Sequence, residues 1–348
     1  MRTVARHLPK LAGAVPWVEL GDWPTPLRAS SIAGREVWIK HEGESHPVYG
    51  GNKIRTLEAW FGHARDRGAS KIWGIGAYGS NHVIATVLHA ERAGLQAAAM
   101  LFPQPTSSWA VENAGATIDT RCEILRLRSV IEVPFAALAI ARREPHAVVM
   151  PPGGATPIGT FGALDAAFEL AEQIEAGLAP PPARIVLAIG STCTTAGLLA
   201  VLQLAHAVGA WRWPVPIVHG VRVTPWPVTS HLRIANLARV TLARVAKLGG
   251  PRVDIGLREL RARLIVDGAE LGPGYGRSTP RSDAAVATLR GPRLDGVYSA
   301  KAAAALLRLH RQGIGPLVFW ATKSEAVLGA PTLEALGAAP RAMIRWLR

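Results

Sequence analysis

Lys53 is the residue whose sequence surroundings most clearly indicate chemistry. It follows Gly50-Gly51-Asn52, and only seven of the 39 basic residues in the chain are lysines. Glycines let a backbone approach a ligand closely, so we expect the neighbouring lysine in a confined pocket. In such a pocket the amine has a lowered pKa and can form a Schiff base with an aldehyde cofactor. The alternative is a solvated lysine in a turn.

A second candidate site is the hydroxyl-rich segment 190–197, Gly-Ser-Thr-Cys-Thr-Thr-Ala-Gly. It lies between an expected strand and an apolar helix, where free N–H groups, hydroxyls and the positive end of a helix dipole meet. This combination suits a phosphate group, although the Lys-Ser/Thr pair of a P-loop is absent. A simple Ser/Thr helix cap is the alternative.

The segment 74–80, Gly-Ile-Gly-Ala-Tyr-Gly-Ser, matches the GxGxxG dinucleotide fingerprint. The fingerprint also needs an acidic residue about 20 positions further on, and residues 94–102 contain none. A dinucleotide-dependent oxidoreductase therefore stays as an alternative from another class. His41, Glu42 and His46 lack the spacing of a helical zinc motif, and no Gly-x-Ser-x-Gly elbow occurs, so we expect neither a metal site nor a serine hydrolase.

Composition limits the class of protein. The length of 348 residues corresponds to about two domains, and 49% hydrophobic residues can form a sizeable core. The net charge of +14 comes mostly from scattered arginines, so we do not expect a nucleic-acid partner, and an anionic cofactor or substrate fits the charge equally well. The apolar runs are too short to cross a membrane, and no secretory signal is evident. We expect a cytoplasmic enzyme.

Short β-rich apolar runs alternate with helical stretches along the chain. This alternation predicts an α/β fold with parallel sheets covered on both faces and ligands at the carboxyl ends of the strands. The Pro-rich segment 179–182 is expected to link two α/β blocks. The expected strands are 37–40, 71–75, 96–102, 184–189, 216–223 and 317–320. The expected helices are 53–67, 82–93, 159–176, 194–207, 229–247 and 299–312.

Together these motifs resemble the 1-aminocyclopropane-1-carboxylate deaminase / D-cysteine desulfhydrase family of pyridoxal-phosphate enzymes. The resemblance runs from about Leu20 to Ala326 and keeps the order and spacing of the family's motifs. It rests on GGNKIRTLE (50–58), GSNH (79–82), PPGGATPIGTFG (151–162), GSTCTTAGL (190–198), GPGYG (272–276), LDGVYSAKA (294–302) and FWATKS (319–324).

The resemblance implies the tryptophan-synthase-β-like fold, with two doubly wound α/β domains of mostly parallel strands. Residues 1–54 and 166–348 would form a larger cofactor-binding domain, residues 55–165 a smaller one, and the active site would lie between them. Pyridoxal 5'-phosphate would be the cofactor, a small amino acid the substrate, and a homodimer the assembly.

The resemblance also assigns cofactor roles to matching residues. Lys53 would bind the cofactor covalently and move protons, and Asn52 would lie beside it. Asn81 would bond the ring oxygen, and Thr322 would meet the pyridine nitrogen as a neutral hydrogen-bond partner. The residues that would hold the phosphate are Ser191, Thr192, Cys193, Thr194 and Thr195.

Other matching residues would contact the substrate. Ser80, Asn81 and His82 would begin a helix that binds the substrate carboxylate, and Ser80 is also the position of the family's nucleophile. Tyr275 and Tyr298 would flank the substrate. The implied chemistry is α,β-elimination or deamination, which yields a 2-keto acid and ammonia.

Two departures from the family's pattern bear on the substrate. The deaminase carries a glutamate after the second tyrosine, where this chain has Ser299, which favours desulfhydrase-like elimination over cyclopropane deamination. The glycines usual after the pyridine partner are Lys323 and Ser324, and a lysine there would crowd the ring or contact an acidic substrate. A catalytically silent ligand-binding relative remains a further alternative.

Overall fold

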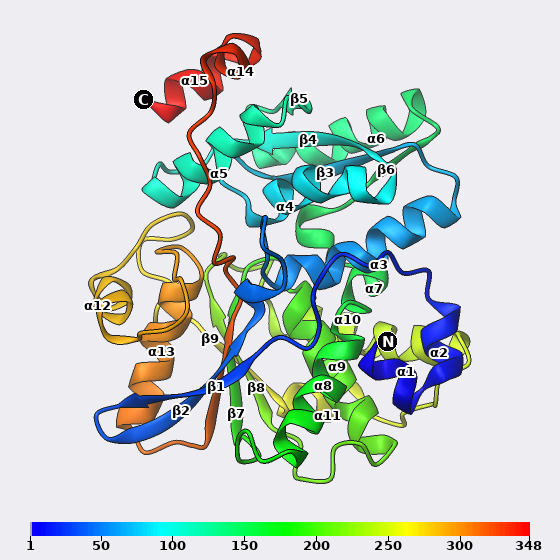
Figure 1. The fold of residues 1–348 in the computed structure, drawn as a ribbon, viewed down its shortest axis with the longest axis vertical. Helices are drawn as coiled ribbons and strands as arrows, with labels where there is room; N and C mark the ends of the chain where they lie inside the picture. Colours follow the sequence, from blue (N-terminus) through cyan, green and yellow to red (C-terminus); the bar gives the residue numbers. More distant parts are fainter. Residues whose placement is uncertain (1) are drawn as a thin grey trace.

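The computed structural model describes residues 2–348, which fold around two β-sheets (Figure 1). The larger sheet has six strands in the order β1-β2-β10-β7-β8-β9. The β1–β2 pair is antiparallel, and all other neighbours in this sheet are parallel. Its strands are β1 (Leu27–Ile32), β2 (Arg35–His41), β7 (Arg184–Ile189), β8 (Ile217–Arg222), β9 (Leu264–Asp267) and β10 (Leu317–Ala321).

The smaller sheet is entirely parallel and has the order β5-β4-β3-β6. Its strands are β3 (Lys71–Ala77), β4 (Gln96–Phe102), β5 (Glu123–Arg126) and β6 (Ala147–Val149). All four come from one continuous stretch of chain, whereas the larger sheet takes strands from before and after that stretch. The chain therefore leaves the larger sheet after β2 and returns to it at β7.

Helices cover both faces of the larger sheet. Successive side chains along β10 point to opposite faces, and both sets are buried under helices. Val318 and Trp320 pack into the core beneath one helical layer, and Leu317 and Phe319 pack beneath the opposite one. The first layer contains α8 (Ala163–Glu175), α9 (Cys193–Ala207) and α10 (His231–Lys247), with α1 (Thr3–His7), α2 (Pro9–Ala14), α7 (Pro157–Thr160) and α11 (Leu257–Ala262) around them. The second layer contains α12 (Pro280–Thr288) and α13 (Ser299–Arg311).

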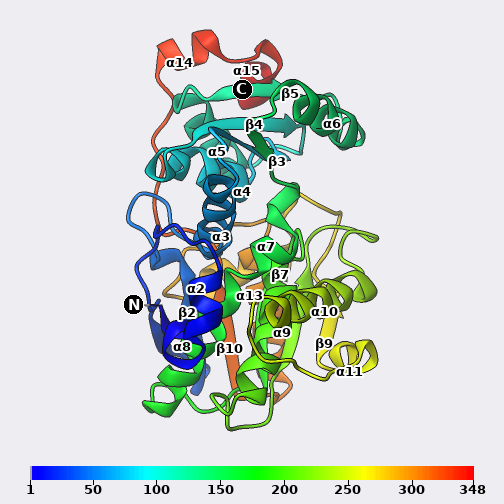
Figure 2. The same cartoon turned by 90° about the vertical axis from the view of Figure 1, so that its right-hand side faces the viewer.

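The smaller sheet is also covered on both faces. One side packs against α3 (Asn52–Asp66), α4 (Asn81–His89) and α5 (Ser108–Asp119), and the other against α6 (Val133–Arg143). The C-terminal helices α14 (Leu333–Ala338) and α15 (Arg341–Leu347) lie against α5, at the smaller-sheet end of the molecule (Figure 2). The short 3-10 helices are η1 (Glu42–Glu44), η2 (Ala90–Ala93), η3 (Val130–Glu132) and η4 (Pro152–Gly154).

A buried ion network holds α3 against the larger sheet. Arg55 on α3 donates from Nε to Glu42 Oε2 at 2.7 Å and from Nη2 to Glu169 Oε2 at 3.0 Å. Lys40 on β2 also donates to Glu169, and all four side chains are buried. Removing one partner would leave a buried charge uncompensated, so this network fixes the end of α3 that carries Lys53.

The structure confirms the α/β class and every expected strand, with ends displaced by at most two residues. The helix expected at 159–176 is interrupted, because the backbone turns at Phe161 and Gly162 between α7 and α8. The expected linker at 179–182 was wrong, since it joins α8 to β7 within the larger-sheet half. The domain boundaries at 54 and 165 stay a prediction. None of the helices formed by residues 2–348 is long and apolar enough to cross a membrane.

Candidate active site

A cavity of about 450 Å³ lies at the carboxyl ends of β3, β7, β8 and β10, between the two sheets. This volume is within the range of cofactor and small-molecule sites. The structure brings every expected site residue to its wall. They are Asn52, Lys53, Ser80, Asn81, His82, Ser191, Thr192, Cys193, Thr194, Thr195, Tyr275, Tyr298 and Thr322. Their individual roles stay predictions.

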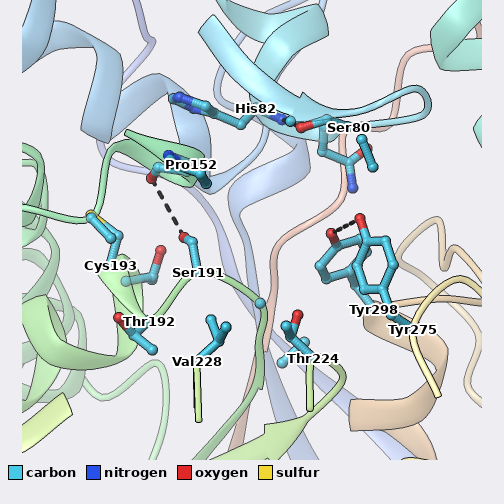
Figure 3. A pocket seen from close by; sticks show the side chains of 18 of the residues that line it. Ser80, His82, Pro152, Ser191, Thr192, Cys193, Thr224, Val228, Tyr275 and Tyr298 are labelled. Carbon is cyan, nitrogen blue, oxygen red and sulfur yellow. Dashed lines mark hydrogen bonds between the residues drawn. The ribbon is translucent and has the colours of Figure 1, made fainter. Parts of the chain in front are cut away.

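Figure 3 shows how these residues surround the cavity. Ser80 and His82 lie on one side of it, and Ser191 lies across from them. The two tyrosines, Tyr275 and Tyr298, lie together at a third side. A ligand in the middle would therefore contact elements of both sheets at once.

Lys53 is placed by the backbone immediately before it. Gly51 has φ +103°, and a Cβ there would lie 2.7 Å from the carbonyl oxygen of Thr322. The N–H of Asn52 donates to that same carbonyl oxygen at 3.3 Å. Only glycine fits this close approach, which brings the start of α3 against the end of β10. Lys53 and Thr322 consequently line the same cavity.

Burial lowers the pKa of the Lys53 amine. A lowered pKa increases the share of neutral amine near neutral pH, and the neutral amine is the nucleophilic and basic form. The side chain makes no hydrogen bond within residues 2–348. The amine is therefore available to an incoming aldehyde.

Gly153 was not among the residues selected from the sequence, yet the cavity depends on it. Its φ is +67°, and a Cβ there would lie 2.0 Å from Ser191 Oγ and 3.6 Å from Lys53 Nζ. Any side chain would therefore collide with the hydroxyl-rich turn and crowd the lysine. The paired glycines of the Pro-Pro-Gly-Gly segment were the available signal.

The turn before α9 has the properties of an anion site. Thr192, its N-cap, has φ +79° and makes no side-chain cap hydrogen bond, so the first N–H groups of the helix remain available. The hydroxyl of Thr192 is buried and has no partner within residues 2–348. Thr194 Oγ1 accepts from Asn52 Nδ2 at 2.7 Å, which leaves its own proton free to donate.

Ser80 caps α4 with its own side chain. Its Oγ accepts from the backbone N–H groups of His82 at 3.2 Å and Val83 at 3.3 Å. Those two donors are thus already occupied and are not free to bind a substrate carboxylate. A substrate carboxylate here would receive the Ser80 O–H and the Asn81 N–H instead.

His82 contributes a neutral ring. Burial lowers its pKa to about 3, with the positive charge of Lys53 acting in the same direction. Neither ring nitrogen has a partner within residues 2–348. The imidazole is therefore uncharged at neutral pH and supplies no positive charge to a carboxylate.

Tyr275 and Tyr298 form a hydroxyl pair. Their oxygens lie 2.6 Å apart, and their rings meet edge to face with centroids 5.9 Å apart. Burial raises the pKa of Tyr275 to about 12 and raises that of Tyr298 as well. Both phenols therefore stay protonated at neutral pH, and the pair can donate a proton into the cavity.

The two departures from the family pattern lie outside the cavity wall. Ser299 is buried, and its hydroxyl accepts from the Asp295 N–H at 2.7 Å and donates to Asp295 Oδ2 at 3.2 Å. Lys323 Nζ donates to Asn81 Oδ1, and Lys323 does not line the cavity. The expectation that it crowds the cofactor ring or contacts an acidic substrate was therefore wrong. Among residues 2–348, no aspartate or glutamate lines the cavity.

Sequence reasoning missed the loop after β8. Thr224, Pro225, Trp226 and Val228 line the cavity, and so does Arg233 at the start of α10. The side chain of Trp226 is 71% exposed, so this loop forms an apolar rim at the opening. The Pro-Trp-Pro triplet was the available signal, but nothing local places it beside residues from other strands.

Comparison with known proteins gives four relevant similarities. Residues 18–317 match the family described as pyridoxal-phosphate dependent enzyme. The chain is 34% identical to a nocardicin C-9' epimerase of Nocardia uniformis subsp. tsuyamanensis, over 91% of this chain and 95% of that protein. It is 29% identical to a D-cysteine desulfhydrase of Klebsiella pneumoniae subsp. pneumoniae, over 92% of this chain and 96% of that protein. A solved structure of an ACC deaminase homologue superposes with a TM-score of 0.74 at 28% identity, covering 92% of this chain and 96% of that one.

Proposed function

Since the chain belongs to the family of pyridoxal-phosphate-dependent enzymes, we propose that it catalyses α,β-elimination on a small β-substituted amino acid. In this reaction the Cα–H bond and the bond from Cβ to its substituent break. Water then releases the 2-keto acid and ammonia. The observation that carries the proposal is a cavity with one basic amine, several hydroxyl donors and no carboxylate among the described residues.

The residues of the cavity fit the cofactor. The Thr192 hydroxyl, which has no partner in the described part of the chain, would hold the phosphate together with the Thr194 hydroxyl and the first N–H groups of α9. Lys53 would bind the aldehyde carbon, since its amine has a lowered pKa and lies beside the side-chain-free Gly153. Thr322 would offer the pyridine nitrogen a neutral hydrogen-bond partner rather than a carboxylate.

Pyridoxal phosphate, when bound, withdraws electrons from the substrate and makes its Cα proton acidic. Lys53 is the base we assign to that proton, because its amine lines the cavity with a lowered pKa, whereas His82 has too low a pKa. Ser80 and the Asn81 N–H would orient the substrate carboxylate. The hydroxyl pair of Tyr275 and Tyr298 would donate a proton to the departing group or to the product carbon.

No carboxylate lines the cavity in the described part of the chain, and this favours elimination over cyclopropane deamination. Opening a cyclopropane ring needs a further nucleophile or proton-handling group beside the substrate. Ser299, at the position of the deaminase glutamate, is turned to Asp295 and does not line the cavity. The protonated hydroxyls that remain suit elimination, in which sulfur or chloride leaves without a strong acid.

Epimerisation at Cα is a second candidate that a specific observation favours. Lys53 can take the Cα proton, and the protonated Tyr275–Tyr298 pair lines the same cavity as a second proton source. A relative that is 34% identical carries the name of an epimerase. Such an enzyme would return a proton to Cα and release no keto acid.

One experiment separates these functions. The holoenzyme is incubated in D₂O with D- and L-cysteine, D- and L-β-chloroalanine and 1-aminocyclopropane-1-carboxylate, with Lys53→Ala as the control. Keto acid and ammonia from a β-substituted amino acid support elimination. Deuterium at Cα with inverted configuration and no keto acid establishes the second candidate. Keto acid from the cyclopropane substrate alone overturns both.

Two further expectations accompany this proposal. The resemblance implies a homodimer, and sedimentation velocity of the purified protein tests that assembly state. A cytoplasmic location rests on composition, and fractionation of the source cells tests it.

A further inference from the structure

Lys323 is a buried lysine, and its side-chain partners among residues 2–348 are all neutral groups. It follows Thr322 at the end of β10, and it is 2% exposed. Its Nζ donates to Asn81 Oδ1 at 3.1 Å, to Tyr49 OH at 3.3 Å and to Asn113 Oδ1 at 3.4 Å. No carboxylate of residues 2–348 forms an ion pair with it. Burying a cation without an opposite charge is costly, which indicates that the position has a use other than packing.

The nearby charges are already engaged elsewhere. Glu112 on α5 pairs with Arg293 at 2.8 Å. Asp295 accepts from the backbone N–H groups of Val297 at 3.0 Å and Tyr298 at 2.6 Å. Burial lowers the pKa of Lys323, while the more distant Asp295 and Glu112 oppose that shift. The three acceptor oxygens therefore take the place of a counter-ion.

These contacts converge on one atom of the cavity wall. Asn81 Oδ1 accepts from Lys323 Nζ, from Tyr49 OH at 2.8 Å and from Asn113 Nδ2 at 2.8 Å. A carboxamide oxygen has two lone pairs, so these three donors saturate it. The amide oxygen of Asn81 is thus fixed on the protein side, and its NH₂ group is left to face the cavity.

We propose that Lys323 is a positioning residue that holds the Asn81 carboxamide with its NH₂ group directed at the bound cofactor. The inference deepens the proposed function, because it requires the cofactor beside Lys53. With methionine at position 323, Asn81 would lose one donor and the positive charge behind it. The amide would then hold an anionic oxygen of the cofactor less firmly.

The expected consequence is spectroscopic. A positive charge and an aligned N–H donor beside an anionic oxygen both disfavour protonation of the bound cofactor. Lys323→Met should therefore raise the pH midpoint of the cofactor's visible absorbance change by about one unit, the size expected for losing a charge-assisted hydrogen bond. The dissociation constant of the cofactor should rise by about tenfold.

The experiment is a pH titration of visible absorbance on the purified holoenzyme and its variants. Ser324→Ala is the matched control, since Ser324 is buried at the same turn as Lys323. Its hydroxyl accepts from the Gly50 N–H and is not one of the groups that bond Asn81. This variant should leave the midpoint unchanged. If Lys323→Met does not fold, Lys323→Gln tests the contribution of the charge, because it keeps an N–H donor, and it should raise the midpoint by a smaller amount.

A double variant tests whether Lys323 acts through Asn81. In an Asn81→Ala background, Lys323→Met should move the midpoint much less than it does in the wild-type background. An unchanged midpoint in the single variant, or a full shift that persists without Asn81, overturns the inference while the cofactor still binds at Lys53. A protein without lysine-linked cofactor absorbance overturns the proposed function instead, so the two failures are distinguishable.

Discussion

The hydroxyl oxygens of Tyr275 and Tyr298 lie 2.6 Å apart in the wall of the cavity that Lys53 also lines. The two residues come from a loop before α12 and from the N-cap of α13, 23 positions apart in the chain. Their raised pKa values keep both phenols protonated up to strongly alkaline pH. The cavity thus combines a base of lowered pKa with a proton donor of raised pKa, an arrangement typical of acid–base catalysis.

Replacing Tyr298 by phenylalanine should therefore slow turnover. Positioned proton donors contribute about 10²–10⁴-fold to rate, so kcat should fall by at least about 100-fold while KM changes little. The steady-state kinetics of Tyr298→Phe test this, and the cofactor absorbance spectrum should be retained. Equal kcat values in the variant and the wild type would show that the pair only packs against the substrate.

Thr194→Val should weaken cofactor retention. The variant loses the hydroxyl that accepts from Asn52 and would donate to the phosphate. Loss of a hydrogen bond to a charged group costs about 1.5–3 kcal/mol, which is about 10- to 150-fold in the dissociation constant. Fluorescence titration of the apoenzyme with pyridoxal phosphate measures it.

Thr241→Val is the matched control for that variant. Thr241 is buried on α10, and its hydroxyl bonds Thr160 Oγ1 at 2.7 Å, away from the cavity wall. The control should bind the cofactor like the wild type. Equal retention by Thr194→Val and Thr241→Val would place the phosphate elsewhere.

Ser80→Ala should impair substrate binding and leave the cofactor spectrum intact. The variant loses the helix cap, at about 0.5–2 kcal/mol, and the O–H donor proposed for the substrate carboxylate. Ser107→Ala removes an equivalent cap, which accepts from the Ala110 N–H at 3.3 Å on α5, and serves as control. KM should rise about tenfold or more in Ser80→Ala only. A similar KM in both variants would reduce Ser80 to a structural cap.

Acid should destabilise the fold from about pH 6.5 downwards, because two buried histidines resist protonation. Burial lowers the pKa of His82 to about 3 and of His89 to about 4. Below about pH 6.5 the unfolded chain binds protons on these rings that the folded protein does not, so the free energy of unfolding falls as pH falls from 6.5 towards 4. For His89 alone the loss approaches about 3 kcal/mol.

Urea unfolding at pH 7.5, 6.5, 5.5 and 4.5 measures this loss. His89→Gln keeps a donor for the Tyr49 carbonyl oxygen, which His89 Nε2 contacts at 2.8 Å, and does not titrate. Its stability should therefore depend less steeply on pH than that of the wild type. Parallel curves for the two proteins would refute the assignment of a neutral buried His89.

The sequence pattern was enough to predict those elements whose structure depends mainly on their own residues. The strands 96–102 and 184–189 coincide with β4 and β7, because an unbroken apolar run between turn residues is typical of a strand that is covered on both faces of its sheet. Four strands were missed: β1 (Leu27–Ile32), β5 (Glu123–Arg126), β6 (Ala147–Val149) and β9 (Leu264–Asp267). They are the edge strands of the two sheets and are only partly buried, so their identity comes from the neighbouring strand and not from their own residues.

The same distinction holds at the site. Lys53 and the turn 190–195 could be selected because glycines and hydroxyls beside them determine their backbone locally. The position of Lys323 could not be predicted, since its partners Tyr49, Asn81 and Asn113 come from three distant segments. Contacts between distant segments are set by tertiary packing, which leaves no local periodicity or spacing in the sequence.

The central claim is that Lys53, and not another buried lysine, carries the cofactor. Lys53 and Lys323 both have lowered pKa values, and Asn81, which bonds Lys323, lines the cavity with Lys53. Sodium borohydride reduction of the holoenzyme, followed by proteolysis and mass spectrometry, identifies the modified residue directly. We predict a single pyridoxyl adduct on Lys53, absent from Lys53→Ala. An adduct on Lys323, or on no lysine at all, would contradict the account.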